Sequence, residues 1–315
     1  MLRELLDISM LQSTLRMATP ILLAALGALV TGAAGIINIG LEGIMLIGAF
    51  FAVVGSYFLG SAWAGVGVAV FSGLVIAILF ATFSLKFRAH IILMGVATNI
   101  FATALTVYLL RFMFKVAGAF SHPDIHGLQP VHIPLIKDIP VTGDLLSGYA
   151  PLVYLTWLFV VGMHVMLYKT PLGRHLRAVG ENAEAAEALG ISIRGIRYFA
   201  VILSGVFASL AGAYLALGHL TMFTEGMSAG RGFIGLAANI FGMQTPVGCL
   251  LASLIFGFAD ALAMRVQGWQ IIPAQFVLML PAVLTIVILV LVSMRNEMAR
   301  KTTKAKHLSL YRPHK

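Results

Sequence analysis

The chain has 315 residues, of which 60% are hydrophobic and 10% are charged, and its formal net charge at pH 7 is +9. Charged residues make up about a quarter of soluble domains, so this composition, with a mean hydropathy of +0.97, excludes a soluble globular protein and predicts an integral membrane protein. The single cysteine, Cys249, excludes an intramolecular disulfide.

Repeated apolar segments predict an all-α polytopic fold rather than a β-barrel. A helix needs about 20 apolar residues to cross a hydrocarbon core about 30 Å thick. The sequence therefore predicts nine spans, within a range of roughly eight to ten, in one transmembrane domain (1–295) that precedes a basic tail (296–315). The spans are expected at about 16–35, 42–60, 63–85, 90–112, 149–168, 197–218, 231–243, 246–265 and 271–293. The seventh is too short to cross alone, which predicts a broken or re-entrant helix that is buried by neighbouring protein or lines a cavity.

The second span starts with a charged residue in an apolar setting. Residues 37–48 read INIGLEGIMLIG, so Glu42 stands between two glycines just before a membrane-length helix. A charge at the bilayer centre costs about 2.5–3.5 kcal/mol even on lenient scales. Glu42 is therefore expected at the lipid boundary or in a polar cavity.

Small residues recur every four positions in the second and third predicted spans. They are Gly48, Ala52, Ser56 and Gly60, followed by Ala69, Gly73, Ala77 and Ala81. Such stripes let helix backbones approach closely in lipid, so their predicted role is architectural.

The segment 116–148 combines four prolines with a series of polar side chains, His122, Asp124, His126 and His132. A metal site is conceivable, but the series lacks a fixed helical geometry and no cysteine assists it. A lid or docking surface is a better interpretation and a plain connector is better still, so no metal site is predicted.

Residues 171–197 predict a short amphipathic helix outside the membrane. Pro171 suits a helix start and Gly190 suits a helix stop. Apolar residues lie three or four positions apart on one face, and Arg174, Arg177, Glu181 and Glu184 line another. Because the charges nearly balance and the apolar face is largely alanine, a protein groove is favoured over a lipid surface.

The two halves of the chain have a similar order of elements. Residues 18–112 and 199–293 each contain a helix rich in small residues, a start with one charge beside glycine (LEG at Glu42, GRG at Arg231), and apolar helices. A fifth span between them inverts the second copy and predicts a substrate path between the halves, although common helix composition could mimic a repeat. The inversion places Glu42 and Arg231 toward opposite membrane faces, each bracing a helix start.

Polar residues at predicted membrane depth are candidates for the translocation path. Asn99 and Asn239 could bond sugar hydroxyls or base edges, or simply a neighbouring helix, and Asp260 is costly unless it is paired or hydrated. The full candidate set is Asn38, Glu42, Asn99, Arg231, Asn239 and Asp260.

Lysine and arginine positions predict the orientation. If the segments around Lys86 and Arg88, from 169 to 197, and after Arg295 are cytoplasmic, they contain 14 of the 21 basic residues. This positive-inside bias places the amino terminus outside and the carboxyl terminus inside. A signal peptide at 17–30 is the less favoured alternative for the start of the chain.

The run GRHLRAVGENAEAAEALG at 173–190 resembles the cytoplasmic coupling loop of ABC-importer permeases of the sugar, nucleoside and branched-chain amino acid group. Two further regions agree, ATPILLAALG at 18–27 with 37–48, and GRGFIGLAANIFG at 230–242. The resemblance covers about 14–293 and is closest to the shorter permease of bacterial nucleoside or simple-sugar importers. It implies ATPase-coupling roles for Gly173, Arg174, Arg177, Gly180, Glu181, Asn182, Glu184, Ala185, Ala186 and Gly190.

The resemblance also implies partners in a bacterial plasma membrane. These are a second, paralogous permease, a cytoplasmic ABC ATPase with two fused cassettes, an extracytoplasmic substrate-binding lipoprotein and membrane lipid. The sequence contains no GxxxxGK[ST] phosphate loop, so no cofactor is expected on this chain and ATP with magnesium is expected on the ATPase. The permease would catalyse no covalent reaction.

Two other classes of function compete with this interpretation. A self-sufficient secondary transporter also uses inverted repeats, but it needs coupling-ion ligands and the central carboxylates are few. A membrane enzyme would need clustered acid, base or metal ligands, which the sequence does not show. Nucleic-acid binding is not expected, because topology accounts for most of the basic residues.

Overall fold

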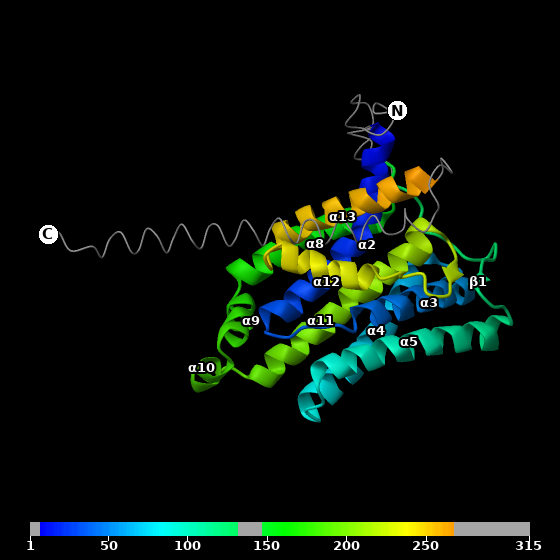
Figure 1. Cartoon of the computed structure of the whole chain (residues 1–315). Coiled ribbons are helices and arrows are strands. Elements are labelled where there is room, and N and C mark those ends of the chain that lie inside the picture. The colour runs from blue at the N-terminus through cyan, green and yellow to red at the C-terminus, as the bar shows by residue number, and fades with distance from the viewer. Residues whose placement is uncertain (1–6, 132–146, 268–315) are drawn as a thin grey trace. The chain divides into compact units, whose positions relative to one another are not determined.

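The computed structural model describes residues 7–131 and 147–267 (Figure 1). The chain divides into two compact units, residues 1–258 and 259–315, so that only 259–267 of the second unit are described. The described residues up to 258 form a helix bundle, which is the first unit.

Within the described residues, seven helical spans are long and apolar enough to cross a membrane. They are α2 (Ile8–Ala33), α3 (Leu41–Leu59), α4 (Ala62–Ala81) continued by a π-helical turn η1 (Thr82–Lys86), α5 (Ile91–Phe114), α8 (Pro151–Lys169), α11 (Ile193–Ala213) continued by η2 (Tyr214–His219), and α13 (Pro246–Gln267).

In the part of the chain that the structure describes, three helices are shorter, namely α9 (Pro171–Glu181), α10 (Ala183–Ala188) and α12 (Arg231–Phe241). The polytopic helical fold is thus confirmed, and α12, with 11 residues, is the short seventh span that the sequence predicted. The predicted ninth span, 271–293, lies outside the described residues.

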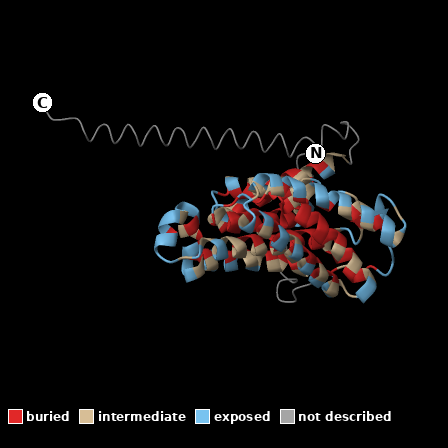
Figure 2. Ribbon diagram, turned by 90° about the horizontal axis from the view of Figure 1, so that it is seen from below, coloured by how far each residue is buried: buried red, intermediate tan, exposed pale blue. Residues whose placement is uncertain are grey.

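Helices α2 and α11 form the centre of the bundle, where they contact α3, and α11 also contacts α4 while α2 contacts α12. Ile21, Leu23 and Leu26 of α2 are fully buried, whereas Phe71 of α4 and Leu93 of α5 are each 68% exposed. Buried residues accordingly gather in the interior of the bundle in Figure 2, and the outer helices present exposed residues. The exposed apolar faces suit contact with lipid or with another membrane protein.

Small residues bring three helices into backbone contact. A Cβ on Gly48 of α3 would lie 2.6 Å from Ser209 Cα of α11. Gly73 of α4 approaches the same serine from another side, and Gly205 of α11 lies against Ala77 of α4. These contacts confirm the predicted packing role for Gly48, Gly73 and Ala77, whereas Gly60 ends α3 and packs against nothing within 4 Å.

Two loop segments far apart in the sequence pair with each other. Strand β1 (Ala119–Phe120) runs antiparallel to β2 (Phe223–Thr224), with Phe120 opposite Phe223. The side chain of Glu225 extends this link, because its Oε1 accepts a hydrogen bond from the Gly118 N–H (3.0 Å) and lies 3.8 Å from Arg111. The segment after α5 is therefore fixed to the segment that leads into α12.

Candidate functional site

The amino end of α3 is held by an asparagine from another helix. The N–H of Gly43 donates to Asn99 Oδ1 (2.8 Å), and Asn99 Nδ2 donates to the Ile39 carbonyl (3.1 Å). The first N–H groups of a helix lack acceptors within the helix. Asn99 of α5 provides the acceptor for one of these groups in α3. Asn38 supplies another, because its Oδ1 accepts from the N–H of Gly40, the N-cap residue (3.0 Å).

Glu42 caps a second helix, α12. Its Oε1 accepts from the N–H of Gly230 (2.8 Å) and its Oε2 from the N–H of Gly232 (2.7 Å). A carboxylate on the exposed N–H groups of a helix start is favoured by both the hydrogen bonds and the helix dipole. The half-buried carboxylate of Glu42 is therefore stabilised by backbone N–H groups at the start of α12.

Glycine is required at this joint for two reasons. Gly230 is the N-cap of α12 with φ of +81°, a left-handed conformation that most residues avoid. A Cβ on Gly232 would lie 2.6 Å from both Cα and N of Glu42. The sequence pattern Gly-Arg-Gly at 230–232 thus fits the close approach of α3.

The prediction that Glu42 and Arg231 lie toward opposite membrane faces is wrong. Arg231 is the first residue of α12, between the two glycines that Glu42 binds. The middle of helix α12 packs against the middle of α2, where Gly235 lies against Ala24. The amino ends of α3 and α12 therefore meet, and Glu42 braces the start of α12 instead of its own helix.

The remaining path candidates are distributed over two regions. Asn38 Nδ2 donates to Ser204 Oγ of α11 (3.1 Å), and both side chains are buried. Asn239, near the other end of α12, accepts a weak hydrogen bond from the Cys249 thiol (3.5 Å). Asp260 belongs to the second unit, on α13. Asn38, Glu42, Asn99 and Arg231 are the candidates that come together, where α3, α5, α11 and α12 meet; we call these four the helix-start cluster.

The segment predicted to couple to an ATPase forms two helices instead of one. Helix α9 starts at Pro171, with Thr170 Oγ1 accepting from the Gly173 N–H (3.2 Å), and α10 is followed by Gly190 with φ of +79°. The prediction of a single helix is wrong because Asn182 is extended and its side chain caps α10 through the Ala185 N–H (3.0 Å).

The apolar face of this segment packs against the bundle. Leu176, Val179 and Ala186 are buried, as is Gly173, which lies against the backbone of Met166 and Leu167. The other predicted coupling residues, except Arg177, are exposed: Arg174, Gly180, Glu181, Asn182, Glu184, Ala185 and Gly190. The charged face is therefore open to a partner, as an amphipathic helix requires.

Gly180 packs this segment against the end of α2, close in sequence to the helix-start cluster. It is pressed against the Ala33 carbonyl and the Gly35 backbone at the end of α2, and a Cβ there would clash with them. From there the chain runs through residues 34–40 into α3. In this stretch the Gly40 N–H donates to the Asn38 side chain, and the Ile39 carbonyl accepts from Asn99. A short stretch of backbone thus separates the coupling segment from Glu42.

The histidine series does not form a metal centre in the part of the chain that the structure describes. His122 Nδ1 lies 3.4 Å from Asp124 Oδ2, and His126 Nδ1 lies 2.9 Å from the Asp124 carbonyl. No group of three metal-binding side chains occurs among the described residues, and His132 lies outside them. The backbone of His126 instead exchanges two hydrogen bonds with Ser56 Oγ, both 2.8 Å.

Sequence reasoning missed Ser204 and the pairing of Glu42 with α12. Ser204 lies among the small residues of α11, and nothing in that pattern distinguishes a hydrogen-bonding serine from a packing one. For Glu42, the glycines on either side of Arg231 were the available signal, because they indicate a close approach by another backbone.

The chain is similar to transport permeases along nearly its whole length. Residues 10–289 match the family described as branched-chain amino acid transport system, permease component. The chain is 34% identical over 290 residues to the guanosine ABC transporter permease protein NupQ of Bacillus subtilis, covering 88% of this chain and 89% of NupQ. It is 35% identical over 284 residues to the nucleoside ABC transporter permease protein NupC of Lactococcus lactis, covering 87% and 89%.

A second guanosine ABC transporter permease protein of Bacillus subtilis, NupP, is 29% identical over 278 residues, which cover 84% of this chain and 76% of NupP. Among solved structures, a chain of PsaBC from Streptococcus pneumoniae aligns with a TM-score of 0.52 at 12% identity, covering 91% of this chain and 95% of that chain. At that identity the likeness concerns the fold.

Proposed function

This chain belongs to the family of branched-chain amino acid transport system permease components, and from that premise we propose that it forms the translocation path of a nucleoside importer. It is a multi-pass membrane protein and a permease subunit of an ABC transporter, which moves a solute and is not an enzyme. The observation that carries the choice of substrate is the 34–35% identity to NupQ and NupC over nearly the whole chain.

The proposed assembly contains a second permease and an ATPase. Bacillus subtilis has two guanosine permease proteins similar to this chain, NupQ and NupP, which supports a pair of paralogous permeases. Because the sequence has no phosphate-binding loop of the GxxxxGK[ST] type, ATP with magnesium would bind a cytoplasmic ATPase with two fused cassettes. An extracytoplasmic lipoprotein would deliver the substrate.

Helices α9 and α10 would receive the movement of the ATPase. Their charged residues other than Arg177 are exposed, and Gly180 touches the end of α2. A displacement of α9 would pass through residues 34–40 to Glu42 and hence to α12. This route is a proposal from contact and geometry, and a mutation that affects coupling without affecting folding is the physical test of such a route.

The helix-start cluster would flank the substrate path. Helix α12 is only 11 residues long and packs against α2 and α3, and short or discontinuous helices border the binding sites of transporters with inverted repeats. The proposed arrangement keeps the amino terminus outside and the carboxyl terminus inside, since this orientation follows the positive-inside bias. The halves 18–112 and 199–293 would then rock around this point to give alternating access.

Uptake measurements test the proposal. Cells that express the chain with its partner permease, ATPase and binding protein are expected to take up labelled guanosine, and omission of the ATPase is expected to abolish uptake. Uptake by this chain alone, unaffected by removal of the ATPase, would indicate a secondary transporter. Uptake of labelled ribose with no uptake of guanosine would overturn the substrate assignment and retain the permease.

A further inference from the structure

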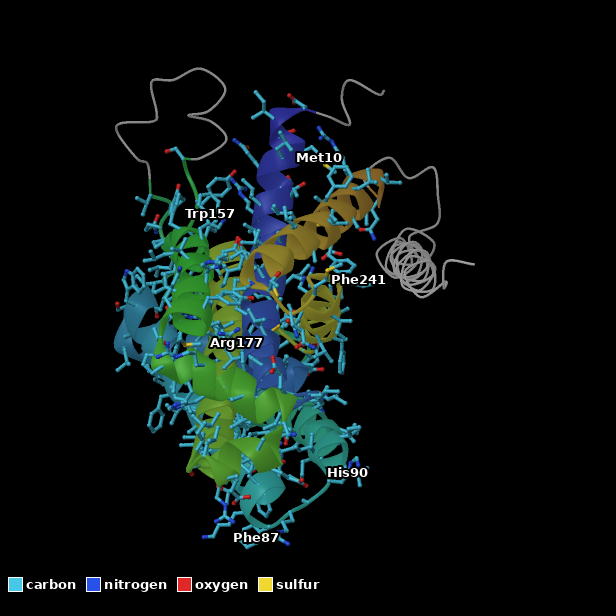
Figure 3. The ribbon with its side chains drawn as sticks, turned by 90° about the vertical axis from the view of Figure 1, so that its left-hand side faces the viewer. Met10, Phe87, His90, Trp157, Arg177 and Phe241 are labelled. Carbon is cyan, nitrogen blue, oxygen red and sulfur yellow. The ribbon has the colours of Figure 1, made fainter. Side chains whose placement is uncertain are left out.

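A pocket opens where α9 crosses the ends of α2 and α8. Its volume is about 210 Å³, and its lining includes Tyr168 from the last turn of α8, Arg177 and Glu181 of α9, and Gln244 from the turn after α12. Figure 3 shows the labelled Arg177 in this region of the bundle, close to α8 and α9.

Arg177 is the unusual group in the pocket. Its Nε is shielded from solvent and has no hydrogen-bond partner, while its guanidinium lies 5.2 Å from the centre of the Tyr168 ring. A buried charged donor without an acceptor is costlier than the roughly 1–3 kcal/mol of a neutral one. The guanidinium of an arginine beside an aromatic ring keeps further N–H groups in a planar fork, which fits the oxygens of a phosphate.

Glu181 places a negative charge in the same pocket. It lies four residues after Arg177 on α9, and side chains with this spacing have Cβ atoms about 5–6 Å apart. Among the described residues neither of the two forms an ion pair. A simple anion would bind Arg177 but be repelled by Glu181. A ligand with a phosphate and an ammonium group a few bonds apart would satisfy both charges.

An exposed apolar stripe leads from the bundle to the pocket along α8. Leu158, Val161 and Val165 are 62%, 60% and 46% exposed, and Tyr168 follows at the pocket. Spacings of three or four residues place all four on one helix face. This stripe lies on a helix apolar enough to cross a membrane, so it suits an acyl chain better than a soluble protein.

We propose that the pocket binds the headgroup of a phosphoethanolamine lipid. The phosphate lies on the guanidinium of Arg177, the ammonium on the carboxylate of Glu181, and an acyl chain on the stripe of α8. The lipid would then occupy the joint between the coupling segment and the bundle. An acidic side chain of the ATPase is the alternative ligand for the Arg177 guanidinium.

Native mass spectrometry of the purified full-length chain tests the proposal. The chain is titrated with phosphatidylethanolamine, with phosphatidylglycerol and with soluble glycerophosphoethanolamine. Arg177→Gln is expected to weaken phosphatidylethanolamine binding by about tenfold or more, the loss of one charge-assisted contact. The matched control is Arg174→Gln, which removes the same charge from the exposed face of the same helix and is expected to leave binding unchanged.

Glu181→Gln is expected to lower the preference for phosphatidylethanolamine over phosphatidylglycerol, because it removes the acceptor for the ammonium group. If Arg177→Gln loses helix content by circular dichroism, Arg177→Lys keeps the charge without the planar fork and is expected to bind more weakly than wild type. Equal binding by the Arg177 and Arg174 variants, or by Arg177→Lys and wild type, overturns the proposal.

Two other results also overturn it. Soluble glycerophosphoethanolamine that binds as tightly as the lipid would assign the pocket to a free headgroup compound. In the assembled transporter, a cysteine at position 177 that cross-links to the ATPase with loss of bound lipid would assign the pocket to the protein partner. Neither result depends on which solute the transporter carries.

Discussion

The helix-start cluster and the coupling segment handle charge in opposite ways. In the cluster, both oxygens of Glu42 accept backbone hydrogen bonds and Asn99 bonds two backbone groups of another segment. In the coupling segment, Glu181 and Glu184 are exposed and Arg177 leaves a buried Nε without a partner. The carboxylate of Glu42 and the amide of Asn99 thus find their partners within this chain, whereas the coupling segment presents charged groups to other molecules.

This difference predicts that substitutions in the two regions will separate stability from function. Loss of a group in the cluster leaves backbone donors unpaired inside the bundle, and stability falls together with transport. Loss of an exposed charge in the coupling segment costs little stability. Such a loss is expected to weaken the binding of the ATPase to the segment.

The largest loss of stability is expected for Glu42→Ala. It leaves the N–H groups of Gly230 and Gly232 without acceptors, at a cost of about 1–3 kcal/mol for each buried group. Thermal unfolding of the chain in nanodiscs measures the loss, with Glu184→Ala as a control that removes the same side chain from an exposed position. Equal melting temperatures for the two variants would contradict the capping role of Glu42.

Gly232→Ala is expected to have the next largest effect. Its Cβ would lie 2.6 Å from the backbone of Glu42, and overpacking of this kind costs about 1–3 kcal/mol. Gly67→Ala on α4 is the matched control, because a Cβ there meets no atom within 4 Å. The same unfolding measurement applies, and a Gly232 variant as stable as the Gly67 variant would show that α3 and α12 can separate freely.

Asn99→Ala should destabilise the chain less, by about 1 kcal/mol, since it removes one side-chain cap from α3. Asn99→Asp keeps the acceptor for the Gly43 N–H but loses the donor to the Ile39 carbonyl, so it tests the two bonds separately. Hydrogen exchange at the start of α3 is the local readout. Unchanged protection of Gly43 in the alanine variant would argue against the cap.

Glu184→Arg is expected to change stability least, within about 0.5 kcal/mol, because the side chain is exposed. ATPase co-purification and ATP-driven uptake are nevertheless expected to fall, since the substitution reverses a charge on the proposed docking face. Glu184→Gln, which removes the same charge without reversing it, serves as the comparison and is expected to lose less uptake. Wild-type uptake by Glu184→Arg would remove this residue from the coupling role.

The sequence predicted the helices well and their mutual contacts poorly. The spans follow from local hydropathy, so α3, α5 and α8 lie within a few residues of their expected positions. The bond between Glu42 and α12 joins segments about 190 residues apart, and only tertiary packing determines such a pairing. The break at Asn182 had a local signal, because asparagine is a preferred N-cap, but the continuous apolar face obscured it.

The contact of Gly48, Gly73 and Gly205 with neighbouring backbone around Ser209 also constrains how the protein can change shape. With almost no side-chain volume between α3, α4 and α11, rotation of one of these helices against another would force main-chain atoms into each other. We therefore expect α3, α4 and α11 to move as one rigid body during each transport cycle. The translocation path must then open at helix–helix interfaces filled by larger side chains, or at the interface with the partner permease.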